Sequence, residues 1–146
     1  MILRSIQEKD IEACAALYAQ VFSSEPWDEN WSEGAARERL LHFYHSNGFC
    51  GVLAEQDGVV GFSLGNIEPF YSGSIFYLRE MCRKANMSKM GVGHKVLAEL
   101  ERELLHQEVQ DVYLITDRAI PASDFYQKNG FNHSDQMGFY AKHIKA

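Results

Sequence analysis

Apolar residues recur every three or four positions in three long segments of this chain, a spacing that predicts amphipathic helices. The helices are expected over residues 10–22, 32–44 and 91–107. Asp10 and Ser32 stand at the starts of the first two and are residue types that cap helix N-termini. A shorter fourth helix is expected to begin at Pro121 and to end at Gly130.

Other runs are rich in alternating, β-branched or aromatic residues and predict strands at 2–6, 49–55, 59–65, 74–83 and 111–116. Gln56-Asp57-Gly58 between two of them is typical of a hairpin turn. The order strand, helix, strand from residue 74 to residue 116 predicts a parallel pair, because a helical crossover joins parallel strands. A last hairpin is expected from residues 131–133 and 137–143.

A glycine-containing loop, Met87-Ser88-Lys89-Met90-Gly91-Val92-Gly93, lies between a predicted strand and a predicted helix. N–H groups of such a loop and of the first helical turn point at an anion, and the helix dipole adds to the attraction. Glycines let the main chain approach a phosphate closely. The loop therefore indicates pyrophosphate binding, although an ordinary turn before a helix has the same pattern.

A second motif, Ala122-Ser123-Asp124-Phe125-Tyr126-Gln127-Lys128-Asn129-Gly130-Phe131, follows about thirty residues later. Together the two segments resemble the GCN5-related N-acetyltransferase (GNAT) superfamily. Its patterns are Arg/Gln-x-x-Gly-x-Gly/Ala and Ala-x-x-Phe-Tyr-x-Lys-x-Gly-Phe. The second pattern matches at every specified position. The first matches only in its glycines, because Ser88 replaces the usual Arg or Gln and Lys89 the frequent Gly.

The resemblance covers nearly the whole chain in order and spacing, and it implies a single N-acetyltransferase domain over residues 1–146. The implied fold is mixed α/β, with a six- to seven-stranded, mostly antiparallel sheet and about four helices. The parallel strands at 74–83 and 111–116 are expected to splay apart, so that the co-substrate acetyl-CoA wedges between them.

The resemblance also implies which residues hold acetyl-CoA. The pyrophosphate is expected at the loop and helix start, made of Ser88, Lys89, Met90, Gly91, Val92, Gly93 and His94. Main-chain groups of Met81, Cys82 and Arg83 are expected to pair with pantetheine like an added strand, and one N–H to polarise the thioester carbonyl. Ala119 stands where the family often has an Asn that contacts the cofactor.

Acetyl transfer to an amine needs a base for the amine proton and an acid for the departing thiolate. Tyr126 occupies the position of the family's general acid, and a phenol pKa near 10 suits donation to a thiolate. A core tyrosine packed behind Phe125 is the alternative. Glu80 is the candidate base, because strand alternation predicts that it shares an apolar face with Phe76, Leu78 and Cys82. Desolvation there raises a carboxyl pKa.

The sequence is also compatible with other roles for Glu80 and with other residues as the base. Glu80 is also suited to a structural ion pair with Arg79 or Arg83, and many family members use a water relay instead. Asp117 and Glu68 are alternative positions for the base.

The acceptor site is expected at Trp27, Asp28 and Trp31, in the segment between the first two helices where family members build it. Two tryptophans beside carboxylates suit a cation, although aromatic residues that close the core are the alternative. The expected reaction is direct attack by a primary amine of a small molecule or peptide in a ternary complex. A non-catalytic acyl-CoA-binding module and a transferase of longer acyl groups remain alternatives.

A net charge of −6 argues against nucleic acid as a partner, because phosphate contacts need clustered Lys and Arg. No run approaches the roughly 18 apolar residues of a membrane span, and no leader pattern is present, so a cytoplasmic protein is expected. Cys14, Cys50 and Cys82 lie in apolar segments as expected buried free thiols, and the histidines show no metal-ligand spacing. Terminal strands of such folds often pair, so a homodimer is an alternative to a monomer.

Overall fold

The computed structural model describes residues 1–145, apart from the side chain of Ser88. It divides into two compact units, Met1–Leu114 and a smaller one that begins at Ile115. The larger unit contains a sheet with the strand order β1-β2-β3-β4-β5. The strands are β1 (Ile2–Ser5), β2 (Phe49–Glu55), β3 (Val59–Phe70), β4 (Gly73–Arg83) and β5 (Val109–Tyr113).

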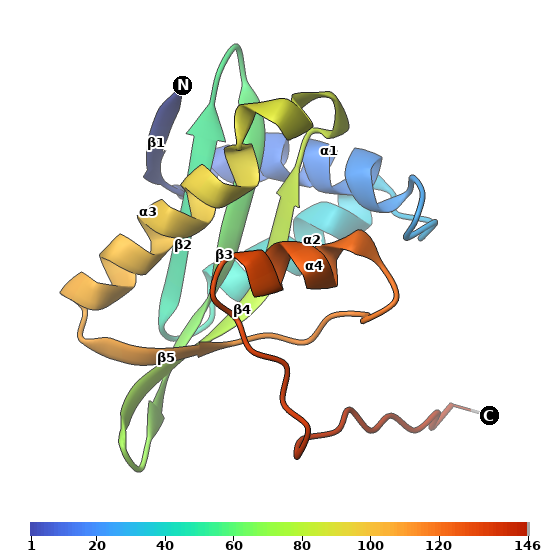
Figure 1. The fold of residues 1–146 in the computed structure, drawn as a ribbon. Helices are drawn as coiled ribbons and strands as arrows, with labels where there is room; N and C mark the ends of the chain where they lie inside the picture. Colours follow the sequence, from blue (N-terminus) through green and yellow to red (C-terminus); the bar gives the residue numbers. More distant parts are fainter. Residues whose placement is uncertain (146) are drawn as a thin grey trace. The chain divides into compact units, whose positions relative to one another are not determined.

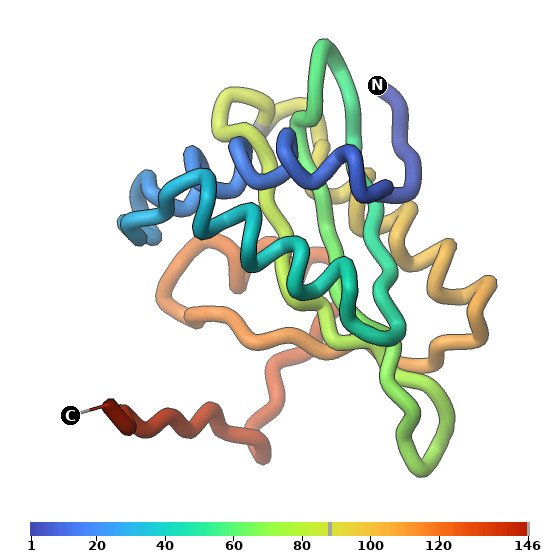
Figure 2. The backbone as a smooth tube through the Cα atoms, turned by 180° about the vertical axis from the view of Figure 1, so that it is seen from behind, coloured from blue at the N-terminus to red at the C-terminus, as the bar shows by residue number. Residues whose placement is uncertain are grey.

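Two layers of helices cover the two faces of this sheet (Figures 1 and 2). Helices α1 (Ile11–Phe22) and α2 (Glu33–Tyr44) lie on one face, and α3 (Val92–His106) lies on the other. Short 3₁₀ turns, η1 (Glu8–Asp10) and η2 (Ala85–Met90), precede α1 and α3. Strands β1 to β4 pair antiparallel, whereas β4 and β5 pair parallel, as the strand–helix–strand order predicts.

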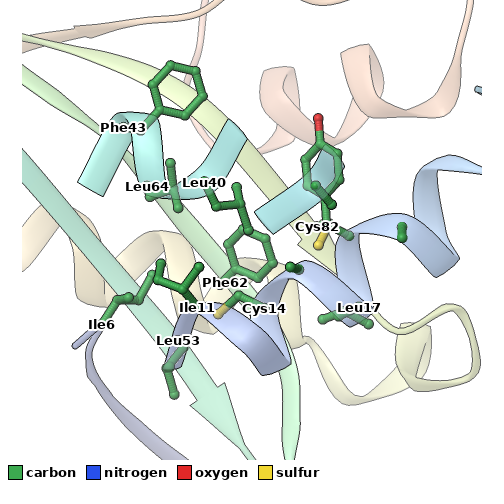
Figure 3. Close-up of a cluster of buried hydrophobic side chains, with 14 residues drawn as sticks. Ile6, Ile11, Cys14, Leu17, Leu40, Phe43, Leu53, Phe62, Leu64 and Cys82 are labelled. Carbon is green, nitrogen blue, oxygen red and sulfur yellow. The ribbon is translucent and has the colours of Figure 1, made fainter. Parts of the chain in front are cut away.

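The core under α1 and α2 contains Phe62 and Leu64 of β3 together with Cys14 of α1 and Leu40 of α2 (Figure 3). These side chains are almost completely removed from water, and their burial is the main stabilising term for this layer. On the opposite face, α3 packs closely on β3 at Gly61. A Cβ atom there would lie 2.6 Å from Cγ1 of Val92, so only glycine permits this approach.

The capping predictions have opposite outcomes. The Ser32 hydroxyl accepts a hydrogen bond from the Ala35 N–H at 3.0 Å and caps α2, as predicted. The prediction for Asp10 is wrong, because its carboxylate makes no capping bond to α1. It accepts two bonds of 2.8 Å from the Arg4 guanidinium and one of 2.7 Å from the Gln7 N–H. The two bonds from Arg4 pair the carboxylate with a full positive charge in a bidentate geometry, which a bond to a backbone N–H of α1 does not provide.

The smaller unit contains α4 (Pro121–Lys128), with Pro121 in its first turn and Gly130 at φ 91° just beyond its end. The predicted hairpin of residues 131–133 and 137–143 is wrong, because residues 131–145 form no strand. A three-residue strand offers few ladder hydrogen bonds, and an isolated two-stranded hairpin is marginal in water. The sheet within residues 1–145 therefore has five strands in place of six or seven, while the mixed fold with four α-helices is confirmed.

The three cysteines are buried and free, as predicted. Each helix within residues 1–145 is too short or too polar to cross a membrane.

Candidate functional site

The loop before α3 has the geometry of an anion site. Gly91 adopts the left-handed conformation at φ 66°, ends η2 and forms the N-cap of α3. Having no side chain, Gly91 provides no capping bond for the first turn, whose Val92 and Gly93 amides are therefore suited to bind an anion. A Cβ atom at Gly91 would meet nothing within 4 Å, so the space beside the loop is open.

The charge around this loop is positive, although the chain as a whole is acidic. Residues 81–98 include no Asp or Glu, and they contain Arg83, Lys84, Lys89 and Lys95. Lys89 is exposed in the turn that leads to Gly91. Ser88 was predicted to contact the pyrophosphate, but its side chain lies outside the described residues. The open loop, the uncapped helix start and the basic surroundings fit the pyrophosphate of acetyl-CoA.

Strand β4 leaves one edge unpaired next to this loop. Its parallel pairing with β5 ends at Tyr77 and Tyr113. From Leu78 to Arg83, the described residues pair β4 with β3 alone. Met81, Cys82 and Arg83 lie on this free segment, so their main chain is suited to pair with an extended ligand. The Cys82 side chain points into the core, and burial raises the pKa of its thiol well above the usual value, which argues against a thiolate nucleophile.

A β-bulge at Arg79 decides where Glu80 points. The pairing passes from Leu64 opposite Glu80 to Gly65 opposite Leu78, so Arg79 has no opposite residue. Opposite residues share a face, and Glu80 therefore lies with Leu64 on the face of α1 and α2, whereas Leu78 lies on the face of α3. The prediction of one shared face for Phe76, Leu78, Glu80 and Cys82 is wrong, because one extra residue inverts the alternation.

Glu80 is 9% exposed and binds residues of both helices above it. Arg39 of α2 donates from Nε to Glu80 Oε1 at 2.6 Å, and the Tyr18 hydroxyl of α1 forms a further hydrogen bond with the carboxylate. Burial raises the pKa of Glu80 above its usual value, and Arg39 and Tyr18 oppose this effect without cancelling it. The predicted structural partners, Arg79 and Arg83, form no ion pair with Glu80.

Tyr126 belongs to the smaller unit and lies in the last turns of α4. Its ring packs edge to face against Phe125 and Phe131, with centroids 5.4 and 5.5 Å away. The positive φ of Gly130 lets the backbone turn back toward the helix, and the Phe131 N–H donates to the Tyr126 carbonyl at 3.0 Å. The spacing of the second motif thus produces one local structure, an aromatic trio around the end of a helix.

A family model described as the acetyltransferase (GNAT) family matches residues 14–131, which include the loop, β4 and α4. The chain belongs to the acetyltransferase (GNAT) family. Membership makes it an acyl-CoA-dependent acetyltransferase with acetyl-CoA as its co-substrate. A search of curated proteins found no match.

Solved structures with the GNAT fold resemble the chain over nearly its whole length. The aminoglycoside acetyltransferase meta-AAC0020 from an uncultured soil metagenomic sample, in complex with sisomicin, has a TM-score of 0.77 and 16% identity over 99% of this chain and 96% of its own. Aminoglycoside N-acetyltransferase AAC(6')-Iy in complex with CoA has a TM-score of 0.76 and 18% identity over 98% and 95%. A putative acetyltransferase from Agrobacterium tumefaciens has a TM-score of 0.78 and 19% identity over 98% and 100%. These identities establish the shared fold.

The predicted acceptor residues of this acetyltransferase lie in the connection between α1 and α2. Trp31 packs against Tyr18 with ring centroids 5.0 Å apart, and its indole N–H donates to Glu29 Oε1 at 2.9 Å. Trp27 packs against Phe22 at 5.0 Å. Asp28 is exposed. Trp31 also packs against the core, as the packing alternative predicts, whereas the printed ring contact of Trp27 is with Phe22, which packs against the core itself.

The alternative bases are engaged elsewhere. Glu68 accepts a hydrogen bond from the Tyr113 hydroxyl at 2.8 Å, and Asp117 accepts one from the Ala119 N–H at 2.8 Å. The sequence alone does not reveal Arg39 and Tyr18, the residues that bind Glu80. They lie 41 and 62 positions away from it, and each occupies an ordinary place on an amphipathic helix, so no local pattern marks them.

Proposed function

We propose that this acetyltransferase transfers the acetyl group of acetyl-CoA to a primary amine of a small molecule or peptide, by direct attack in a ternary complex. The observation that carries the proposal is that one strand, β4, holds a buried carboxylate and leads directly into the anion loop. Glu80 lies three residues before the strand ends at Arg83, and η2 follows at Ala85.

The loop and the strand edge bind the co-substrate. The amides of Val92 and Gly93, with Lys89 and the neighbouring residues Ser88, Met90, Gly91 and His94, hold the pyrophosphate. Main-chain groups of Met81, Cys82 and Arg83 hold the pantetheine arm along the unpaired edge of β4, and one N–H polarises the thioester carbonyl. When bound, acetyl-CoA supplies the acetyl group as a thioester.

Glu80 takes the proton that the acceptor nitrogen loses as it forms a bond to the thioester carbon. Its raised pKa suits this role, because a base is most effective when its pKa approaches the working pH. The ammonium of the acceptor releases its other proton to solvent before it attacks. The C–S bond breaks, and Tyr126 gives its phenolic proton to the departing thiolate, which becomes the free thiol of CoA. The proton held by Glu80 then returns to the Tyr126 phenolate through solvent. The role of Tyr126 is supported by its place in the second motif.

The acceptor approaches from the face of α1 and α2, where Glu80 points. Trp27, Asp28 and Trp31 provide aromatic surface and negative charge for its ammonium group. That two of the structural neighbours are aminoglycoside acetyltransferases supports a small-molecule amine, since both act on amines of that size.

An acceptor screen that follows the release of free CoA tests the proposal. Acetyl-CoA is incubated with the full chain and a panel of small amines, amino acids, peptides and aminoglycosides, and the product is identified by mass spectrometry. We expect CoA release that depends on the amine, and an N-acetyl product. Tight binding of acetyl-CoA with no release for any amine identifies a binding module, and release only from longer acyl-CoA substrates identifies a different acyl donor.

A further inference from the structure

A second charged side chain, Arg79, lies next to Glu80 and is held in a clamp of two aromatic rings. Its guanidinium carbon lies 4.0 Å from the ring centroid of Tyr77 on the same strand and 5.3 Å from that of Phe43 on α2. Aromatic rings bind a guanidinium through its flat face. Such stacking leaves the N–H groups at the edge of the guanidinium directed outward, and the Arg79 side chain is exposed.

The pairing of β4 with β5 holds Tyr77, one of the two rings of this clamp, in place. Tyr77 lies opposite Tyr113 at the last paired position of β4 and β5, and the two rings stack with centroids 4.5 Å apart. The Tyr113 hydroxyl donates to Glu68 Oε1 at 2.8 Å, which prevents that ring from rotating away. The guanidinium of Arg79 is therefore positioned before any ligand arrives, which lowers the entropic cost of binding one.

Among the described residues, no acidic side chain neutralises the charge of Arg79. Arg39 stacks on the same Phe43 ring at 4.9 Å but pairs with Glu80. Two arginines thus share one ring, and in the described part of the chain Arg39 alone of the two has an anionic partner.

The bulge gives Arg79 and Glu80 a common face, so a cation and a carboxylate stand side by side where β4 parts from β5. An amine that also carries a carboxylate complements both charges, with its nitrogen at Glu80 and its carboxylate on the planar edge of Arg79. We propose that Arg79 binds a carboxylate of the acceptor, which makes the substrate an amino acid or another carboxylate-bearing amine. This inference rests on the proposed function and specifies its acceptor.

The same geometry disfavours polycationic acceptors. Aminoglycosides carry several ammonium groups and no carboxylate, so they would place like charge against Arg79. The shared fold with aminoglycoside acetyltransferases therefore does not extend to a shared acceptor.

Matched acceptors test the role of Arg79. CoA release is measured with free L-amino acids, with their primary amides, with the corresponding decarboxylated amines, and with dipeptides. We expect the wild-type kcat/KM to be about 10- to 100-fold higher for the acid than for its amide, as one charge-assisted pair provides. A preference for dipeptides over free amino acids assigns the carboxylate to a peptide C-terminus.

In Arg79→Gln, the KM of the acid should rise about 10- to 100-fold, the amide should be unaffected, and the Kd of acetyl-CoA should stay the same. Arg79→Lys should recover only part of the preference, because an ammonium lacks the planar fork. Arg37→Gln removes an exposed arginine of α2 and should leave the preference intact.

Calorimetric titration of the amino acids into wild-type protein and Arg79→Gln gives a readout that does not need turnover. Equal use of acids and amides by the wild type, or an equal loss for both in Arg79→Gln, overturns the role of Arg79 and leaves the acetyltransfer proposal standing. Binding that depends on Arg79 and on the carboxylate, without CoA release from any acceptor, supports this site and overturns the proposed function.

Discussion

Arg39 lies on the solvent side of Glu80. Its Nε donates to Glu80 Oε1 at 2.6 Å, and the arginine side chain is 43% exposed whereas the carboxylate is 9% exposed. Arg39 thus supplies the positive charge that faces Glu80 Oε1 in this structure.

Replacing Glu80 should remove a base. For the wild type, kcat/KM should rise with pH through an apparent pKa above the reference value near 4.3, because burial raises the pKa of this carboxyl. Glu80→Gln should abolish this rise, the acidic limb of the pH–rate profile. It should also lower kcat about 10²- to 10⁴-fold, with the Kd of acetyl-CoA unchanged. The measurement is a pH–rate profile with two acceptors of different basicity.

Glu68→Gln is the matched control, since it neutralises a carboxylate that is engaged with Tyr113 on the same face. Its profile should retain the limb. If the limb instead follows the basicity of the amine and survives in Glu80→Gln, a water relay serves as the base and Glu80 is structural.

Removing the cation beside Glu80 should move this limb upward. Arg39 favours the ionised carboxylate and opposes the effect of burial, so Arg39→Gln should raise the apparent pKa of Glu80 further. At a fixed pH near neutrality, a smaller fraction of Glu80 is then ionised and kcat/KM falls, and activity returns as the pH rises. Arg37→Gln, on the same helix, should leave the limb in place. A limb that moves down in Arg39→Gln contradicts this assignment.

A negative charge at Gly91 should displace acetyl-CoA. Gly91→Glu places a carboxylate where the pyrophosphate is proposed to lie, and like charges there should weaken binding on the order of 100-fold or more. Gly91→Gln has the same size and the same backbone strain at φ 66° without the charge, so it separates electrostatics from shape. Calorimetry at two salt concentrations measures both. Equal affinities for the two variants would show that no phosphate lies near Gly91.

Tyr126→Phe removes only the proposed proton donor. The edge-to-face packing with Phe125 and Phe131 is retained, so the fold should be unaffected. We expect kcat to fall roughly 10- to 1,000-fold and the Kd of acetyl-CoA to stay the same. Tyr140→Phe, at a tyrosine that is 92% exposed, serves as the control. Full activity in Tyr126→Phe would show that Tyr126 only packs against its neighbours and donates no proton.

Ser63 on β3 provides a test of stability. It is completely buried, and its hydroxyl has no hydrogen-bond partner among the described residues. Ser63→Ala removes this unsatisfied group and should stabilise the protein by about 1–3 kcal/mol, which raises Tm by roughly 2–4 °C per kcal/mol at this size. Ser5→Ala, an exposed strand position, should have almost no effect in the same thermal unfolding experiment. A lower Tm for Ser63→Ala would indicate a bound water at the hydroxyl.

Local rules predicted much of the fold because the segments concerned carry strong periodicity. The helix expected over 91–107 is found at Val92–His106, and the strand expected over 74–83 at Gly73–Arg83. Strand β3 was expected to end at residue 65 but continues to Phe70, through Asn66 and Pro69, which are poor strand formers. Ten backbone pairings with β4 outweigh those weak preferences.

The candidate site was predictable only where a motif is continuous in sequence. The glycine loop and the α4 motif place their residues within ten positions, so their local structure follows from local patterns. The environment of Glu80 depends on a bulge and on side chains from α1 and α2, and periodicity carries no signal for an inserted residue or for a partner that lies 41 positions away. For the same reason Arg79 was one alternative ion-pair partner of Glu80, whereas it stacks on Tyr77.

Because of the bulge at Arg79, side chains of β4 alternate between the two faces of the sheet in one pattern before this residue and in the opposite pattern after it. Deleting Arg79 would restore simple alternation and leave every other residue of the strand on its present face, because Leu64 would still lie opposite Glu80 and Gly65 opposite Leu78. The alternation of β4 therefore tolerates the loss of one residue at two places, the bulge at Arg79 and the turn at Tyr71 and Ser72, where no register is set.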